Sequence, residues 1–242
     1  MKLARYTPKT PEEAIAFDEL LLIKAESGQI GETIWFWDPP SFFVVLGRAR
    51  EVGADCHLER CRQDGLKIIR RISGGGTVLQ GPGCFNYTLV LSYDRSERYR
   101  NIRDSYRDIL GKISDGLGKK SFDVRFYPLS DLALDGKKIS GNAQARKRRF
   151  FLHHGTFLCG LDIGKVSGYL SHPDTEPEYR SGRSHENFMV NIPITPTEVR
   201  NVIKGAFLPQ DISGWRPDKN FLDQLDGLVA SKYSKDEWNF AF

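Results

Sequence analysis

The sequence has no apolar stretch long enough to cross a membrane, and its first six residues, Met1 to Tyr6, lack the apolar core of a signal peptide. It has only four cysteines, and none of them has CxxC or zinc-ligand spacing. It also has no internal repeat, no low-complexity tract and no Pro/Ser-rich linker. These absences argue against a membrane protein, a disulfide scaffold and a repeat array. We therefore expect a soluble cytoplasmic protein with reduced thiols.

What is present is typical of a globular enzyme-sized chain. The 242 residues are 40% hydrophobic and 27% charged, which suits one large α/β domain, or one domain with a short appendage. The net charge of +4 is mild. It suits acidic small molecules or an acidic protein partner and does not require nucleic acid.

Short strands that alternate with helices predict an α+β fold. Apolar periodicity and capping signals predict helices at 11–28, 55–63, 102–117, 165–170, 196–207 and 221–230. Strands are predicted at 33–37, 42–46, 67–71, 85–91, 122–126, 132–134, 137–145 and 150–159, with 85–91 buried mainly on one face. Asp38-Pro39-Pro40 and Asp135-Gly136 are predicted hairpin turns. Hairpin connections favour a mixed or antiparallel sheet with flanking helices over a doubly wound sheet.

The run Arg70-Arg71-Ile72-Ser73-Gly74-Gly75-Gly76-Thr77 is the most informative segment. Three adjacent glycines weaken a strand, but they let a backbone lie against a bulky ligand. Arginines beside such a turn can donate to phosphate or carboxylate groups. The run matches neither the P-loop nor the dinucleotide-binding pattern. A ligand cradle and a glycine-rich turn with two solvated arginines both remain open.

The predicted strand at 137–145 carries two adjacent lysines, which must point to opposite faces. One of the two must therefore point inward, where a lysine is costly unless it meets a negative partner. The alternative is that Lys137 is solvated and Lys138 reaches past the sheet edge. Gly141 and Ala143 fall on the face opposite Lys138 unless a bulge at Gly141 changes the register.

Three further groups have an ordinary structural interpretation. His153 and His154 are neighbours in a strand and cannot easily share a metal ion, so one of them is interpreted as a structural hydrogen-bonding residue. Cys84 and Cys159 lie in apolar strands, where a thiol is usually inert. The run Arg146 to Arg149 is interpreted as a solvated hairpin loop, with a basic patch for an acidic protein as the alternative.

Taken together, these segments resemble the lipoate–protein ligase A family of the biotin/lipoate ligase and octanoyltransferase superfamily. Residues 70–78 resemble its RRxSGGGTV signature, and Asn86-Tyr87 matches the Asn-aromatic pair that follows. Residues 137–144 resemble the K[IV]xGxAq element, which places the essential lysine of the family at Lys138, and residues 153–156 resemble HHGT. Residues 178–185 are similar, more loosely, to a later adenylate-side loop. The match covers roughly residues 10 to 210.

The resemblance implies a fold and a reaction. The fold is a central mixed, largely antiparallel sheet with a smaller second sheet and flanking helices, akin to class II synthetase cores. The reaction is ATP-dependent attachment of lipoate, through lipoyl-AMP, to a lysine of a lipoyl carrier domain. Such carriers belong to the acyltransferase of a 2-oxoacid dehydrogenase complex or resemble the glycine-cleavage H protein. The Val78 and Tyr87 strands are expected to hold the acyl tail.

The same resemblance implies the site residues. Lys138 is the expected catalytic residue, and Mg²⁺ is expected through the ATP phosphates and Asp131. The residues expected to bind substrate or adenylate are Arg70, Arg71, Ser73, Gly74, Gly75, Gly76, Thr77, Asn86, Asp131, Gly141, Ala143, His154, Gly155 and Arg183.

The competing interpretation is an ATP-independent octanoyl or lipoyl transferase. Such transferases of the superfamily form a cysteine thioester, yet residues 124–128 and 169–187 contain no cysteine. A non-catalytic protein that binds lipoate or the carrier is a further alternative, which the lysine motif disfavours. Biotin ligation is disfavoured because the GRGRxG type of signature is missing.

Domain organisation departs from that of two-domain ligases. The tail after about Val190 looks too short for a C-terminal accessory domain, so we expect a single catalytic domain over 1–242, with 191–242 as its helical extension. Some relatives need a separate accessory protein for activation, and such a subunit is an expected possible partner.

Overall fold

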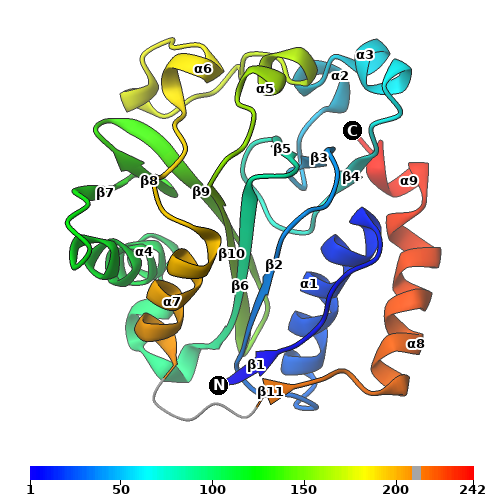
Figure 1. The fold of residues 1–242 in the computed structure, drawn as a ribbon. Helices are drawn as coiled ribbons and strands as arrows, with labels where there is room; N and C mark the ends of the chain where they lie inside the picture. The colour runs from blue at the N-terminus through cyan, green and yellow to red at the C-terminus, as the bar shows by residue number, and fades with distance from the viewer. Residues whose placement is uncertain (209–213) are drawn as a thin grey trace.

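The computed structural model describes residues 1–208 and 214–242, so the part of the expected helical extension at 209–213 lies outside it. Within the described residues, eight strands form one sheet in the order β11-β1-β2-β6-β10-β9-β8-β7 (Figure 1). Their bounds are β1 Lys2–Ala4, β2 Thr33–Trp37, β6 Cys84–Ser92, β7 Val124–Tyr127, β8 Asp131–Leu134, β9 Lys137–Arg146, β10 Phe150–Leu158 and β11 Gly214–Trp215. The pairs from β2 to β7 are antiparallel, whereas β1 pairs in parallel with β2 and β11. The sheet is therefore mixed and largely antiparallel.

A smaller sheet has the order β4-β3-β5, formed by Ile68–Arg70, Phe43–Leu46 and Val78–Gln80. This arrangement corrects the hairpin expected at Asp38-Pro39-Pro40. β2 and β3 belong to different sheets, so this segment carries the chain from one sheet to the other. Its prolines cannot donate ladder hydrogen bonds, which suits a crossing segment as well as a turn. The hairpin at Asp135-Gly136 is confirmed, because Leu134 pairs with Lys137.

Helices cover both faces of the large sheet. α4 (Ile102–Gly118) and α7 (Pro196–Phe207) pack on one face, and α1 (Pro11–Glu26) and α8 (Lys219–Leu228) lie on the other (Figure 1). β6 is therefore buried on both faces along Cys84 to Leu91, which corrects the one-faced burial expected for it. Leu89 and Leu91 contact the α4 side, whereas Val90 contacts the α1 side.

Shorter helices surround the small sheet. They are α2 (Val52–Asp55), α3 (Leu58–Gln63) and α5 (Gly164–Tyr169), which share a core cluster with β3 and β5. α6 (His185–Phe188) follows a loop, and α9 (Asp236–Asn239) lies against β4. Among the described residues, no helix combines the length and apolar composition that crossing a bilayer requires.

The segment after Val190 is joined to the rest of the fold at several places. α7 packs on α4, β11 pairs with β1, and α8 packs on α1. The sequence predicted α7 and most of α8 but not β11 or α9. Thr195 begins α7 with a capping box, as expected from its Thr-Pro-Thr-Glu motif.

Candidate functional site

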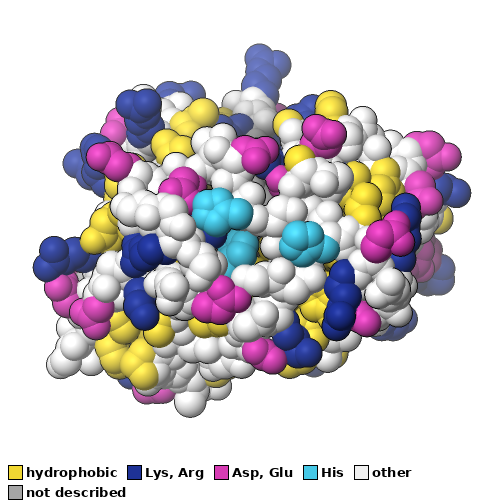
Figure 2. Space-filling model, turned by 90° about the horizontal axis from the view of Figure 1, so that it is seen from above, with side chains coloured by type: hydrophobic (Ala, Val, Ile, Leu, Met, Phe, Trp, Pro, Cys, Tyr) yellow, Lys and Arg dark blue, Asp and Glu magenta, His cyan; other side chains and the backbone are white. Residues whose placement is uncertain are grey.

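A cavity of about 740 Å³ lies between the two sheets, with walls from β6, β9 and β10 on one side and β3 and β5 on the other. Figure 2 looks down on the end of the molecule where α5 and α6 lie, and histidine, basic and acidic side chains gather near the middle of that face. The residues expected in the site that line this cavity are Arg71, Gly74, Gly75, Gly76, Thr77, Asn86, Asp131, Lys138, Gly141, Ala143, His154 and Gly155. Residues that are widely separated in sequence thus meet at one place.

Lys138 faces the cavity and forms an ion pair. Its Nζ lies 2.8 Å from Oδ1 of Asp131, and the two side chains are 24% and 8% exposed. β9 lies inside the sheet, so the alternative that Lys138 reaches past a sheet edge is wrong. Lys137 is exposed, as expected.

A β-bulge places Lys138 and Gly141 on the same face. Lys138 pairs with Ala133 and Ser140 pairs with Leu132, which leaves Ile139 as the extra residue. A Cβ atom on Gly141 would lie 2.9 Å from Nζ of Lys138. The regular register, with Gly141 on the face opposite Lys138, is therefore wrong. The bulge lies at Ile139, two residues before the position considered for it.

Asp131 has a second partner. Its Oδ2 accepts a hydrogen bond of 2.9 Å from the Tyr179 hydroxyl, and burial together with the Asp131 charge raises the pKa of Tyr179. The carboxylate is thus fixed between a cation and a phenol. This arrangement orients the Lys138 ammonium group toward the cavity.

The buried Arg71 side chain fixes the conformation of the glycine run through hydrogen bonds. Its guanidinium donates to the carbonyls of Gly74 and Gly76 at 2.5 and 2.8 Å and to the Ser73 hydroxyl at 2.8 Å. Burial lowers its pKa to about 10, which leaves it charged at neutral pH. Gly75 has a φ of +85°, a conformation that glycine adopts without strain. The run is therefore an ordered loop on the cavity wall, and its two arginines are buried instead of solvated.

Arg70 does not line the cavity, which corrects its expected role as an anion-binding residue. The side chain is fully buried, and its guanidinium donates to backbone carbonyls of the loop 47–50 and of α9. The side chains of the two adjacent arginines point to different sides of the chain. The sequence alone does not tell which of the two faces the cavity. Ser73 is likewise fully buried and acts on the site through His154.

His154 belongs to a hydrogen-bonded chain that begins on α1. Its Nδ1 donates to Oδ2 of Asp18 at 2.6 Å, and its Nε2 accepts from the Ser73 hydroxyl at 2.7 Å. This tautomer follows from the partners, because Ser73 already accepts from Arg71 and the Asp18 carboxylate can only accept. Sequence analysis missed Asp18, which lies in an ordinary amphipathic helix pattern.

His153 is the structural histidine of the pair. It is fully buried between Tyr87 and Gln144, and burial lowers its pKa to about 3. Its imidazole is therefore neutral at physiological pH.

Arg183 was expected in the site, but Arg180 lines the cavity in its place. Arg183 donates to the carbonyls of Gly136, Tyr179 and Arg180 and does not line the cavity. Arg180 does line it, is 5% exposed, and has a buried Nη2 without a hydrogen-bond partner. Burial lowers its pKa. Such an unpaired buried donor is costly unless a ligand accepts from it.

Arg48 and Arg50 are the other cations on the cavity wall that sequence analysis missed. Arg50 pairs with Asp55, whose pKa the hydrogen bonds from Arg50 and Thr77 lower against the opposing effect of burial. A Gly-Arg pair directly after a strand was the available signal. It is too common to stand out alone.

None of the four cysteines lines the cavity. Burial raises the pKa of the thiols of Cys84 and Cys159 to about 12, so both are neutral and poor nucleophiles at neutral pH. This agrees with the inert roles expected for them.

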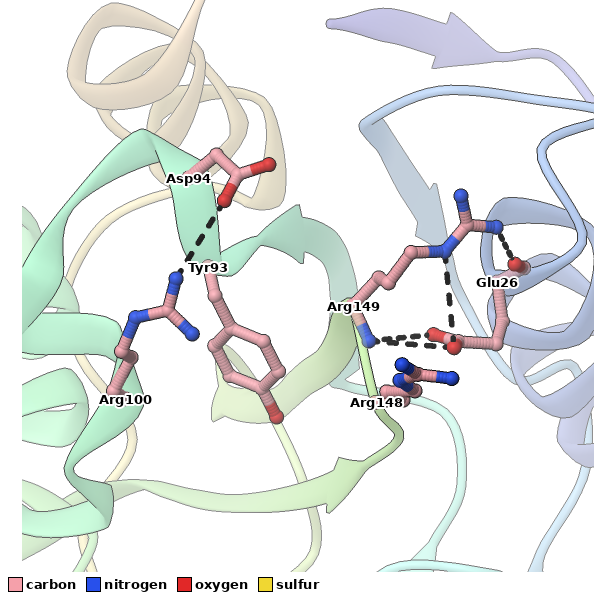
Figure 3. A pocket seen from close by; sticks show the side chains of 6 residues that line it. All are labelled: Glu26, Tyr93, Asp94, Arg100, Arg148 and Arg149. Atoms are coloured by element: carbon pink, nitrogen blue, oxygen red, sulfur yellow. Dashed lines mark hydrogen bonds and ion pairs between the residues drawn. The ribbon is translucent and has the colours of Figure 1, made fainter.

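A second pocket lies at the opposite end of the β9–β10 hairpin (Figure 3). Acidic partners accompany two of its arginines: Arg100 lies 3.7 Å from Asp94, and Nε of Arg149 lies 3.9 Å from Glu26. The run Arg146 to Arg149 is thus part of a hairpin connection, as expected. None of the residues expected in the site lines this pocket, and we take the larger cavity as the candidate site.

Metal binding by protein side chains alone finds no support in the described residues. No group of three or more His, Cys, Asp or Glu side chains there is placed to hold an ion. Asp131 is the expected ligand, and both of its oxygens already have partners.

Comparison with known proteins gives consistent matches. The model of the lipoyl protein ligase A/B catalytic domain matches residues 10–207. The chain is 24% identical over 231 residues to the probable lipoate-protein ligase A of Mycoplasma pneumoniae, covering 93% of this chain and 67% of that protein. It is 25% identical over 265 residues to the octanoyltransferase LipM of Lysinibacillus sphaericus, covering 96% and 95%.

Solved structures show the same fold. The bi-partite lipoate protein ligase of Thermoplasma acidophilum, described with its E2 lipoyl domain, has a TM-score of 0.83 at 23% identity and covers 99% of this chain and 95% of that chain. A lipoate-protein ligase A bound with ATP has a TM-score of 0.83 at 22% identity, covering 99% and 98%. The expected α+β fold with a large mixed sheet and a smaller second sheet is confirmed.

Proposed function

Because the chain belongs to the lipoyl protein ligase A/B catalytic domain family, we propose that it attaches lipoate to a lysine of a lipoyl carrier domain through lipoyl-AMP, with ATP as co-substrate. The observation that carries this proposal is the chemistry of the cavity. A lysine fixed by a carboxylate faces it, and no thiol does. Adenylate formation needs cations that neutralise two anions, whereas a thioester mechanism needs a nucleophilic sulfur.

In the first step, a lipoate carboxylate oxygen forms a bond to the α-phosphorus of ATP, and the bond to pyrophosphate breaks. Both reactants are anions, so positive charge must be present as the new bond forms. Lys138 holds this charge at the carboxylate. Arg180 supports it from the cavity wall: its Nε is engaged by Glu176 and the Arg183 carbonyl, whereas its buried Nη2 has no acceptor.

Mg²⁺ would add to this neutralisation when it is bound to the phosphates. Such an ion needs only one or two protein carboxylates, because phosphate and water oxygens complete its octahedron. Asp131 lies on the cavity wall and is the residue that would hold such an ion. The Asp131 carboxylate alone therefore meets the need of a phosphate-bound Mg²⁺ for one protein carboxylate.

In the second step, the carrier lysine attacks the carbonyl carbon of lipoyl-AMP. A C–N bond forms, the bond from carbonyl carbon to phosphate oxygen breaks, and AMP leaves while the amine loses a proton. Lys138 acts as an electrostatic clamp on the reacting carbonyl group and not as a nucleophile. The glycine run allows close approach of the acyl-adenylate.

The acyl chain has an apolar wall available. Val78, Tyr87, Trp37 and Ile15 line the cavity between the two sheets. Burying an eight-carbon chain there is favourable at about 0.8 kcal/mol per CH₂ group. This region is the proposed site of the dithiolane tail.

An ATP-independent octanoyl transfer to the same carrier is the second candidate, since the LipM relative matches nearly the whole chain. The positions of the cysteines speak against it. Cys84 is buried and Cys159 is half-buried, both have raised pKa values, and both lie outside the cavity lining.

The proposed partner is a folded lipoyl domain, in keeping with the E2 lipoyl domain named for the Thermoplasma acidophilum system. That ligase is described as bi-partite, and a separate accessory subunit is therefore a proposed second partner.

The deciding experiment is intact-mass spectrometry of an apo lipoyl domain. The purified chain, with lipoate, ATP and Mg²⁺, is expected to add one lipoyl mass, and omission of ATP is expected to prevent it. The reaction is run with and without a bi-partite accessory protein. Equal modification without ATP from an octanoyl-carrier donor would establish the transferase instead.

A further inference from the structure

Arg70 contacts Trp238, Asn239 and Phe242, although more than 160 positions separate it from them in sequence. Arg70 Nε donates to the carbonyl of Trp238 at 3.1 Å, and its Nη2 donates to the carbonyl of Asn239 at 3.0 Å. The backbone of Arg70 is held as well, because its N–H donates to Asn239 Oδ1 and its carbonyl accepts from Trp238 Nε1. The family model ends at residue 207, so this contact lies outside the matched region.

Arg70 connects this segment to the loop 47–50. Its Nη1 donates to the carbonyls of Gly47, Arg48 and Arg50 at 3.1, 3.2 and 2.7 Å. The side chain is fully buried. A buried guanidinium needs all of its donors satisfied, and here two separate backbone segments supply the acceptors.

The loop 47–50 in turn packs directly on the glycine run. A Cβ atom on Gly47 would lie 2.0 Å from the carbonyl oxygen of Gly75, so the two backbones are in the closest contact that glycine permits. The Arg48 N–H also donates to the Ser73 carbonyl at 2.9 Å. The Arg48 and Arg50 side chains extend from this loop into the cavity lining.

We propose that Trp238 and Asn239 are positioning residues for the active site. Through Arg70, they hold the loop 47–50 against the glycine run and so fix the place of two cavity cations, Arg48 and Arg50. The C-terminal segment, distant in sequence from every signature motif, is thereby part of the machinery that shapes the substrate cavity. The kinetic consequence rests on the proposed ligase function, whereas the structural consequence does not.

Amide hydrogen exchange tests the structural part. Asn239→Leu removes the acceptor for the Arg70 N–H, and the amides of Arg48 and Arg50 are expected to exchange about fivefold faster or more, as for loss of one hydrogen bond. Trp238→Phe removes one donor but keeps an aromatic ring, so a smaller change in the same amides is expected. Asn220→Ala, on the exposed face of α8, is the matched control and is expected to leave them unchanged.

Steady-state kinetics of lipoylation tests the functional part. Asn239→Leu is expected to raise KM for ATP several-fold with a smaller change in kcat. Asn239→Asp keeps the acceptor for the Arg70 N–H but loses the amide donor to the Tyr233 carbonyl, so it is expected to restore part of the effect. Faster exchange confined to residues 229–242, or uniform acceleration across β6 and β10, would overturn the proposal. If Asn239→Leu does not fold, the exchange rates of the Arg48 and Arg50 amides in Trp238→Phe decide the question. Absence of any ATP-dependent activity in the unmodified chain would refute the ligase function while leaving the exchange result valid.

Discussion

Lys137 and Lys138 are adjacent and chemically identical, yet only one faces the cavity. Lys138→Ala is expected to lower the lipoylation rate about 10²- to 10³-fold, because it removes the cation that stabilises charge in the transition state. Lys137→Ala is the matched control, since that side chain is exposed, and it is expected to retain most activity. Rates are measured by intact mass of the carrier. Full activity of Lys138→Ala would remove this lysine from the mechanism.

Arg180 provides a second prediction at a single side chain. Its Nη2 is buried, without a partner, on the cavity wall, so a bound phosphate group would gain a charge-assisted hydrogen bond there. Arg180→Gln is expected to weaken ATP binding about tenfold or more. Arg125→Gln, which alters an exposed arginine on β7, is expected to leave ATP binding unchanged. Isothermal titration calorimetry measures both variants, and equal affinities would contradict the role of Arg180.

Sequence patterns located the lysine that faces the cavity but did not distinguish the arginines that line the cavity from those that do not. The resemblance of residues 137–144 to the lysine element of the family identified Lys138, whereas strand alternation alone left open which of the two lysines points inward. Arg70 and Arg183 were expected in the site, yet both donate to backbone carbonyls from distant segments. Which arginine meets a carbonyl and which meets a ligand depends on tertiary contacts. Asp18 was missed for the same reason, since its partner His154 lies 136 positions away.

At the level of the element, β10 carries a titrating group that links stability to pH. His153 has a pKa of about 3 in the fold, against an ordinary value of 6.5 in the unfolded chain. Between these values only the unfolded chain binds the proton, so this contribution to stability is fully present above pH 6.5 and is lost as the pH falls toward 3. The expected slope is at most about 1.4 kcal/mol per pH unit.

His153→Gln is expected to flatten this dependence relative to the unmodified chain. Urea unfolding at several pH values between 4.5 and about 7 measures the free energy of unfolding. His57→Gln, an exposed position on the loop before α3, is the control and should keep the original slope. Identical slopes for all three proteins would show that His153 does not remain neutral in the fold.

Most elements with strong local signals were predicted from the sequence, and those stabilised by pairing alone were not. The capping box at Thr195 and the Asp135-Gly136 turn carry their own hydrogen bonds or backbone preferences. β1 has three residues and β11 has two, and both are held by pairing alone. β1 pairs with β2 on one side and with β11 on the other. The crossing from β2 to β3 looked like a hairpin because turn residues do not reveal which sheet the next strand will join.

At the scale of the whole molecule, the cavity depends on the relative placement of two sheets. The glycine run connects β4 to β5 in the small sheet, whereas Lys138 and His154 come from the large one. A ligand that contacts both walls therefore stabilises the association of the two sheets. It is expected to bind the folded chain and not the unfolded one.

A non-hydrolysable lipoyl-adenylate analogue should accordingly raise the melting temperature. At about 100 times its Kd, binding contributes about 2.7 kcal/mol, which corresponds to a rise of roughly 5–10 °C for a domain of this size. Lipoate or AMP alone, which contacts part of the cavity, is expected to give a smaller shift at the same concentration. Differential scanning fluorimetry measures the shifts, with Lys138→Ala as a variant of weakened affinity. A full shift from lipoate without any adenylate part would favour a lipoate-binding protein over an adenylate-forming ligase.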